Sequence, residues 1–188
     1  MKLYLIASVA AAALVFTDRA AAQGQDHFAF GVSGGVAVAT DHLRDLHTNG
    51  PTGMLSLAIG AVDTPVGIRF DFMYSAFGER AGSGAFPRQG KARIIGLTGN
   101  LVLPVLGQSN RLYAIAGVGG YGYRPDATGP ENGTNFGLNA GLGVWIPRVS
   151  GFVEGRFHNV YRALPDRVDA TRNARSARYY PITFGLLF

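Results

Sequence analysis

Residues 179–188 read YYPITFGLLF, and their side chains alternate in character along the stretch. Every second residue counted back from the last is large and apolar or aromatic: Tyr180, Ile182, Phe184, Leu186 and Phe188. Because side chains of a β-strand point to two faces in turn, this predicts a strand with one wholly apolar face. Chain ends of water-soluble proteins are usually polar and frayed. We therefore expect this strand to face an apolar environment.

The same alternation recurs in seven upstream segments that are separated by turn-forming residues. They are His27–Thr40, Thr52–Val62, Val66–Ser75, Lys91–Pro104, Arg111–Tyr123, Asn135–Ile146 and Gly151–Tyr161. In the fifth segment we assign Tyr113, Ile115, Tyr121 and Tyr123 to the apolar face. Short connections alternate with long polar ones that hold most of the charged residues. This arrangement is typical of transmembrane β-barrels of the bacterial outer membrane.

The composition agrees with an all-β protein. The chain of 188 residues contains 27 glycines, and interior glycine weakens helices by about 1 kcal/mol each. It has no cysteine, which excludes disulfides and thiol chemistry. The formal net charge is +5, almost all of it from arginine, but no nucleic-acid-binding fold accompanies that charge. We expect no nucleic-acid partner and a single domain.

The first residues have the features of an export signal. Lys2 is followed by an apolar run from Leu3 to Phe16 and by the small residues Ala20, Ala21 and Ala22. This is the pattern of a secretory signal peptide, and the apolar run is short for a membrane helix. We predict a signal peptide over residues 1–22 and an outer-membrane β-barrel domain over residues 23–188.

Two barrels can be built from this alternation, and charge decides between them. A soluble, lipocalin-like barrel would turn its apolar face inward and show water a face that is about 25–35% charged, whereas the whole chain is 15% charged. A membrane barrel turns the apolar face to lipid. It then encloses a charge network of Arg69, Asp71, Glu154, Arg156 and His158. An arginine facing mid-bilayer lipid costs about 2–4 kcal/mol, which favours the membrane barrel. We place Tyr74, Tyr113, Tyr121, Tyr123, Tyr161 and Tyr180 in interfacial girdles.

Four stretches resemble the small eight-stranded outer-membrane barrels of the OmpA/OmpX-like β-barrel domain family: LYAIAGVGGYGY at 112–123, NFGLNAGLGVWI at 135–146, FVEGRFHNVY at 152–161 and YYPITFGLLF. The resemblance implies an eight-stranded antiparallel up-and-down transmembrane barrel in the bacterial outer membrane. It also implies that Tyr180, Ile182, Phe184, Leu186 and Phe188 form a signal for the outer-membrane assembly machinery. We expect a monomer with both termini on the periplasmic side.

The candidate chemistry is sparse, so we predict a structural or surface-interaction role through the long loops, without catalysis, cofactor or metal. Arg167, Arg172 and Arg175 are candidates for contact with lipopolysaccharide phosphates. The alternatives are a narrow ion-conducting barrel and a lipid A-modifying enzyme based on His158 and Ser75. The GxGxxG match at 117–122 lacks the following helix that a dinucleotide site needs. The His and Asp residues at 41–47 fit no specific metal motif.

Overall fold

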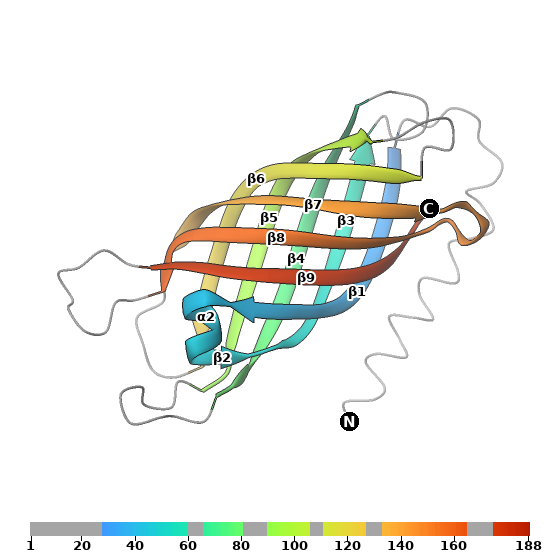
Figure 1. Ribbon diagram of the computed structural model, residues 1–188. Coiled ribbons are helices and arrows are strands. Elements are labelled where there is room, and N and C mark those ends of the chain that lie inside the picture. The colour runs from blue at the N-terminus through green and yellow to red at the C-terminus, as the bar shows by residue number, and fades with distance from the viewer. Residues whose placement is uncertain (1–27, 60–65, 81–89, 106–110, 127–132, 165–174) are drawn as a thin grey trace.

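The computed structural model describes residues 28–59, 66–80, 90–105, 111–126, 133–164 and 175–188. Eight long strands follow one another in antiparallel order around a barrel (Figure 1): β1 (Phe28–Thr40), β3 (Gly50–Ile59), β4 (Gly67–Glu79), β5 (Ala92–Pro104), β6 (Leu112–Pro125), β7 (Thr134–Ile146), β8 (Gly151–Leu164) and β9 (Arg175–Leu187). The predicted all-β, eight-stranded barrel is confirmed.

Two pairings show that the barrel is closed. The closing strand β9 lies antiparallel to β1, from Gly31 opposite Leu187 to Thr40 opposite Arg178. On the far side of the strand order, β4 pairs with β5 from Gly67 opposite Val102 onward. A closed barrel has no free sheet edge, so all strands satisfy their backbone groups within the wall. We call the end that holds the 3-10 helix η2 (Pro147–Val149) the short-turn end and the opposite end the long-loop end.

The two surfaces of the wall differ as the alternation predicts. The apolar row of the closing strand faces outward, since Tyr180, Ile182 and Phe184 are each about half exposed. The neighbouring Tyr179, Pro181 and Thr183 are buried in the lumen. All the remaining long strands, with the exception of β6, also have the predicted inner and outer faces. The outside of the barrel is thus a belt of large apolar side chains around a lumen that holds four of the charged side chains, Arg69, Asp71, Glu154 and Arg156.

Strand β6 corrects the prediction, because its two faces are the reverse of those assigned from the sequence. Tyr121 and Tyr123 are buried in the lumen, and Tyr113 reaches Glu154 there. These three tyrosines are therefore not part of an interfacial girdle. The lumen has room for Tyr121 because glycines face it from both neighbouring strands. A Cβ atom on Gly96 or Gly137 would lie 2.8 Å and 2.6 Å from the Tyr121 ring.

The first long connection contains two elements that the sequence did not suggest. Helix α2 (Asp41–Leu46) leads into the short strand β2 (His47–Thr48), which pairs with the end of β4. Leu43 and His47 are fully buried at the long-loop end, next to Tyr123 and Phe77. This connection therefore folds over the mouth of the barrel, as Figure 1 shows.

Several predictions concern residues outside the described ranges. The signal peptide at 1–22 lies there, and so do Arg167 and Arg172. Within the described residues, no helix is long and apolar enough to cross a membrane.

Candidate functional site in the barrel lumen

Four charged side chains from β4 and β8 form a closed ring across the lumen. Arg69 Nη2 donates to Glu154 Oε2 at 2.6 Å, and Arg69 Nε donates to Asp71 Oδ2 at 3.3 Å. Arg156 Nη2 lies 2.7 Å from Asp71 Oδ2, and Arg156 Nε donates to Glu154 Oε1. Each carboxylate thus contacts both arginines. We call these four residues the lumen tetrad.

Neutral side chains complete the hydrogen bonding of the two carboxylates. Ser56 Oγ donates to Asp71 Oδ1 at 2.5 Å, and Asn100 Nδ2 donates to Asp71 Oδ2 at 2.9 Å. The Tyr113 hydroxyl donates to Glu154 Oε2 at 2.8 Å. On the cation side, the Arg69 guanidinium lies 5.5 Å from the centre of the Phe152 ring. These contacts come from β3, β5, β6 and β8, so the tetrad ties most of the wall together.

The charges of the tetrad balance, which is what makes their burial possible. Two arginines and two carboxylates sum to zero, and their side chains are at most 4% exposed. Removing a charge from water is costly, and the cost is offset only by close opposite charges with complete hydrogen bonding. The tetrad meets the first condition and part of the second: both carboxylates accept several hydrogen bonds, whereas Arg156 Nη1 has no hydrogen-bond partner among the described residues. It spans the lumen at the level of Arg69 and Glu154.

His158 lies in the lumen, as predicted, but belongs to a separate aromatic layer on the long-loop side of the tetrad. Its Nδ1 is 2.9 Å from the Tyr121 hydroxyl, and its ring stacks on Tyr179 at 4.9 Å between centroids. The Tyr179 hydroxyl reaches Met73 Sδ at 3.6 Å, and Phe77 packs edge-on against the Tyr179 ring. The predicted charge network therefore divides into four charged residues and one histidine with aromatic partners.

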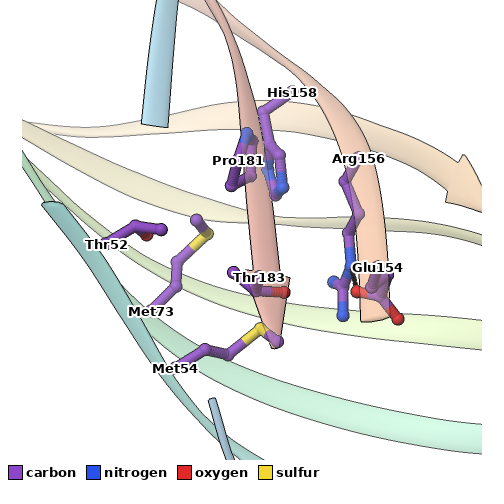
Figure 2. A pocket seen from close by; sticks show the side chains of 8 residues that line it. All are labelled: Thr52, Met54, Met73, Glu154, Arg156, His158, Pro181 and Thr183. Carbon is purple, nitrogen blue, oxygen red and sulfur yellow. Dashed lines mark hydrogen bonds and ion pairs between the residues drawn. The ribbon is translucent and has the colours of Figure 1, made fainter. Parts of the chain in front are cut away.

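A small cavity lies between the tetrad and the aromatic layer. Figure 2 shows Glu154 and Arg156 on one side of it and Met54 and Met73 on the other. The remaining lining residues are Thr52, His158, Pro181 and Thr183. Its volume, counted as space open to the centre of a water molecule, is about 10 Å³, which is room for about one water. Side chains therefore fill the lumen at this level.

The long-loop end adds a third layer of contacts. His47 Nε2 lies 2.7 Å from the Tyr123 hydroxyl, beneath helix α2. Next to this, Asn49 Oδ1 accepts a hydrogen bond from the Ala39 backbone N–H at 3.0 Å. His47 is thus held inside the barrel, while His42 of the same segment stays near the surface beside Asp45. Among the described residues, no three His, Asp or Glu side chains lie close enough together to hold a metal ion.

The other residues singled out by the sequence lie outside the lumen tetrad. Ser75 is buried with its hydroxyl 2.8 Å from that of Thr52, whereas His158 is bonded to Tyr121. Arg175 begins β9 at the long-loop end, where its Nη1 lies 3.3 Å from His42 Nδ1. The GxGxxG residues 117–122 lie within β6, which continues as a strand to Pro125.

Sequence reasoning missed several members of the lumen site. Ser56, Asn100 and Tyr113 bind the carboxylates, and Tyr121 and Tyr179 form the aromatic layer. Ser56 and Asn100 lie on the predicted inner face of their strands, and this position could have identified them as partners of the lumen charges. Tyr179 also lies on the predicted inner face, whereas Tyr113 and Tyr121 gave no such signal, because an aromatic ring suits lipid and lumen equally.

The barrel has the fold of small bacterial outer-membrane proteins. Neisserial surface protein A superimposes with a TM-score of 0.56 and 14% identity over 88% of this chain and 98% of that one. Ail of Yersinia pestis, in complex with the heparin analogue sucrose octasulfate, gives 0.54 and 12% over 87% and 100%. OprG of Pseudomonas aeruginosa gives 0.52 and 12% over 88% and 98%. No protein family matches the chain, and no curated protein matches it in sequence.

Proposed function

We propose that this chain is an integral outer-membrane protein whose closed barrel is a scaffold for contacts at its long-loop end. The observation that carries the proposal is the distribution of apolar and charged side chains, which is the reverse of that in a soluble protein. Large apolar side chains such as Phe70, Leu97 and Phe184 are 45–63% exposed, while four charges are buried in the lumen. A soluble protein rarely exposes apolar patches of more than a few hundred Å², whereas a bilayer favours such a belt.

Fractionation of the cell envelope tests this proposal. We expect the mature protein in the outer-membrane fraction, and we expect its folded form to migrate differently from the heated form on a denaturing gel. N-terminal sequencing of that band is expected to begin at Gln23. Recovery of the protein as a soluble periplasmic species contradicts the proposal.

Contacts with lipopolysaccharide are the surface interaction that the charges favour. Arg175 lies at the long-loop end of β9, and Arg167 and Arg172 belong to the same connection in the sequence. Guanidinium groups suit bidentate binding of phosphate. Replacing Arg167, Arg172 and Arg175 by glutamine is expected to weaken association with lipopolysaccharide. Unchanged association contradicts this contact.

The assembly role of the closing strand is part of the same proposal. Tyr180, Ile182 and Phe184 face outward, and Phe188 pairs through its backbone with Phe30. Substitution of Phe188→Ala is expected to lower the rate of insertion by the assembly machinery more than the stability of inserted molecules. Wild-type insertion kinetics of that variant contradict the assembly role.

An ion-conducting barrel is the second candidate, because charged groups do line the lumen. The tetrad closes the path, so we expect no steady conductance from the wild-type protein in a planar bilayer. Steady conductance of the wild-type protein supports the channel instead. We propose that the protein is not an enzyme, since Ser75 and His158 each have another partner. A change in lipid A mass between cells with and without the protein contradicts that view.

A further inference from the structure

Two arginines face outward side by side near the long-loop end of β5 and β6. Arg93 lies between Ala92 and Ile94, which are fully buried in the lumen, so its own side chain points away from the barrel. Arg124 follows the buried Tyr123 and faces outward for the same reason. The two arginines are direct cross-strand partners. Like charges in this position repel each other, so the pair favours an anion between or beside them.

The described acid nearby only partly balances this charge. Arg93 Nη2 donates to Asp126 Oδ1 at 2.6 Å, but the side chains are 51% and 38% exposed. Exposed ion pairs of this kind are weak and exchange readily with other anions. Lys91 is a further cation at this edge, where its carbonyl accepts a hydrogen bond from the Asp126 backbone. Three cations and one carboxylate leave the cluster positive.

Two outward-facing glycines, Gly122 and Gly120, lie directly below the arginine pair, and we call the low surface over them the recess. The next cross-strand pairs toward the short-turn end are Ile95 with Gly122 and Leu97 with Gly120. A Cβ atom on Gly122 would meet no atom of the described residues within 4 Å, and one on Gly120 would lie 3.0 Å from Thr134 Cγ2, the end of a side chain. Gly90 is the one described glycine with a positive φ. Neither packing within the chain nor backbone conformation therefore requires glycine at 122.

The walls of this recess are apolar apart from Thr134, the partner of Gly122 on β7, and they lie at the level of an interfacial aromatic. Leu97 and Phe136 flank Gly120 on the two neighbouring strands and are more than half exposed. Tyr74, 42% exposed, is the partner of Ile95 on the other side of β5. Outward tyrosines mark the membrane–water interface, which places the arginine pair at the headgroups.

We propose that Arg93 and Arg124 bind a phosphate of the lipid A headgroup of lipopolysaccharide, with one acyl chain lying over Gly122 and Gly120. This site rests on the proposed outer-membrane location. Guanidinium groups donate charge-assisted hydrogen bonds to phosphate oxygens in a bidentate manner. A lipid is favoured over a soluble phosphate because the cationic pair is continuous with an apolar recess that opens to the bilayer.

The opposite side of the same rim supplies a contrast. Arg178 also faces outward, but its Nε donates to Asn159 Oδ1 at 3.0 Å and its Nη1 donates to Asp41 Oδ2 at 2.8 Å. Its direct cross-strand partners are Thr40 and Asn159 rather than another cation. Arg178 is therefore a matched control for loss of an outward arginine at this end, and the exposed Arg148 in η2 is the control for the other end.

Lipid titration of the full folded chain in detergent, followed by native mass spectrometry, tests the site. The probes are hexa-acylated bisphosphoryl lipid A, the same lipid without phosphates, and inorganic phosphate as a competitor. We expect the wild type to bind the phosphorylated lipid about tenfold more tightly than the other. Arg93→Gln/Arg124→Gln should remove that difference, whereas Arg148→Gln/Arg178→Gln should change affinity less than about twofold.

Three results overturn the proposal. They are wild-type affinity in the Arg93→Gln/Arg124→Gln variant, an equal loss in the control variant, and displacement of the lipid by inorganic phosphate at a concentration equal to that of the lipid. Gly122→Leu fills the recess and should lower lipid A affinity about fivefold. Unchanged affinity overturns the placement of an acyl chain over Gly122. Each variant is first checked for outer-membrane fractionation and heat-dependent migration. A chain that passes these checks but fails to bind lipid A contradicts this site and leaves the proposed location intact.

Discussion

Strands β4 and β6 flank β5 in the same wall, yet they use their two faces in opposite ways. Strand β4 turns Phe70 and Phe72 to the outside and Arg69 and Asp71 to the lumen. Strand β6 turns Ala116 and Gly120 outward and its tyrosines inward. The comparison teaches that size does not decide which way a side chain points. A polar group goes inward when the lumen supplies its partner.

The tyrosines of β6 show how this works. Tyrosine combines a large apolar ring with one hydroxyl that needs a hydrogen-bond partner when buried. Tyr113 finds that partner in Glu154 and Tyr121 finds it in His158. The rings then fill space that glycines on the neighbouring strands leave open, as at Gly96 and Gly137. The lumen thus provides each of these tyrosines with both space for its ring and a hydrogen-bond partner for its hydroxyl.

The largest expected effect comes from breaking the β4 side of the comparison. Asp71→Ala removes the carboxylate that contacts both arginines and leaves two buried cations with one anion. We expect the free energy of unfolding to fall by about 3–5 kcal/mol, because an unpaired buried charge remains. This change is measured by urea titration of the protein in lipid vesicles, with the folded fraction read from the intensity of the folded band on a gel. The control Phe70→Leu, on the lipid face of the same strand, should change stability by less than about 1 kcal/mol. Equal effects of the two substitutions contradict the assignment of faces.

The sequence predicts most of this architecture because charge and bulk usually agree. In β4 and β8 the residues that cannot face lipid, such as Arg69 and Glu154, alternate with the bulky ones, so a single register suits both. Their mutual pairing could not be read, since it depends on which strands face each other across the lumen. His158 was grouped with the charges, but it lies two residues beyond Arg156 and meets Tyr121 and Tyr179 instead.

Two features lay beyond sequence reasoning for other reasons. In β6 the alternation is strong, but both faces suit lipid, since one is aromatic and the other is small. Helix α2 and strand β2 come from a polar segment whose buried Leu43 and His47 become core residues only once the barrel mouth exists. Tertiary packing rather than local propensity forms this six-residue helix.

A second test compares a lumen-facing glycine of β7 with an outward-facing glycine of β6. Gly137→Ala places a Cβ atom 2.6 Å from the Tyr121 ring and 3.0 Å from the Asn159 carbonyl oxygen. We expect a loss of about 1–3 kcal/mol from overpacking. Gly122→Ala meets nothing within 4 Å on the outer face and should stay within about 0.5 kcal/mol of the wild type. The same urea titration gives both values, and a reversed order contradicts the placement of Tyr121.

The smallest expected effect tests the hydroxyl that turns Tyr121 inward. Tyr121→Phe keeps the ring between Gly96 and Gly137 but removes the hydrogen bond to His158 Nδ1. We expect a loss of about 1 kcal/mol, the usual net contribution of such a bond. Tyr161→Phe is the matched control, because Tyr161 faces outward, 40% exposed, on β8. If Tyr121 lay on the lipid face instead, the two substitutions would have equal effects. A loss confined to Tyr121→Phe indicates that the hydroxyl, in addition to the ring, stabilises the inward position of Tyr121.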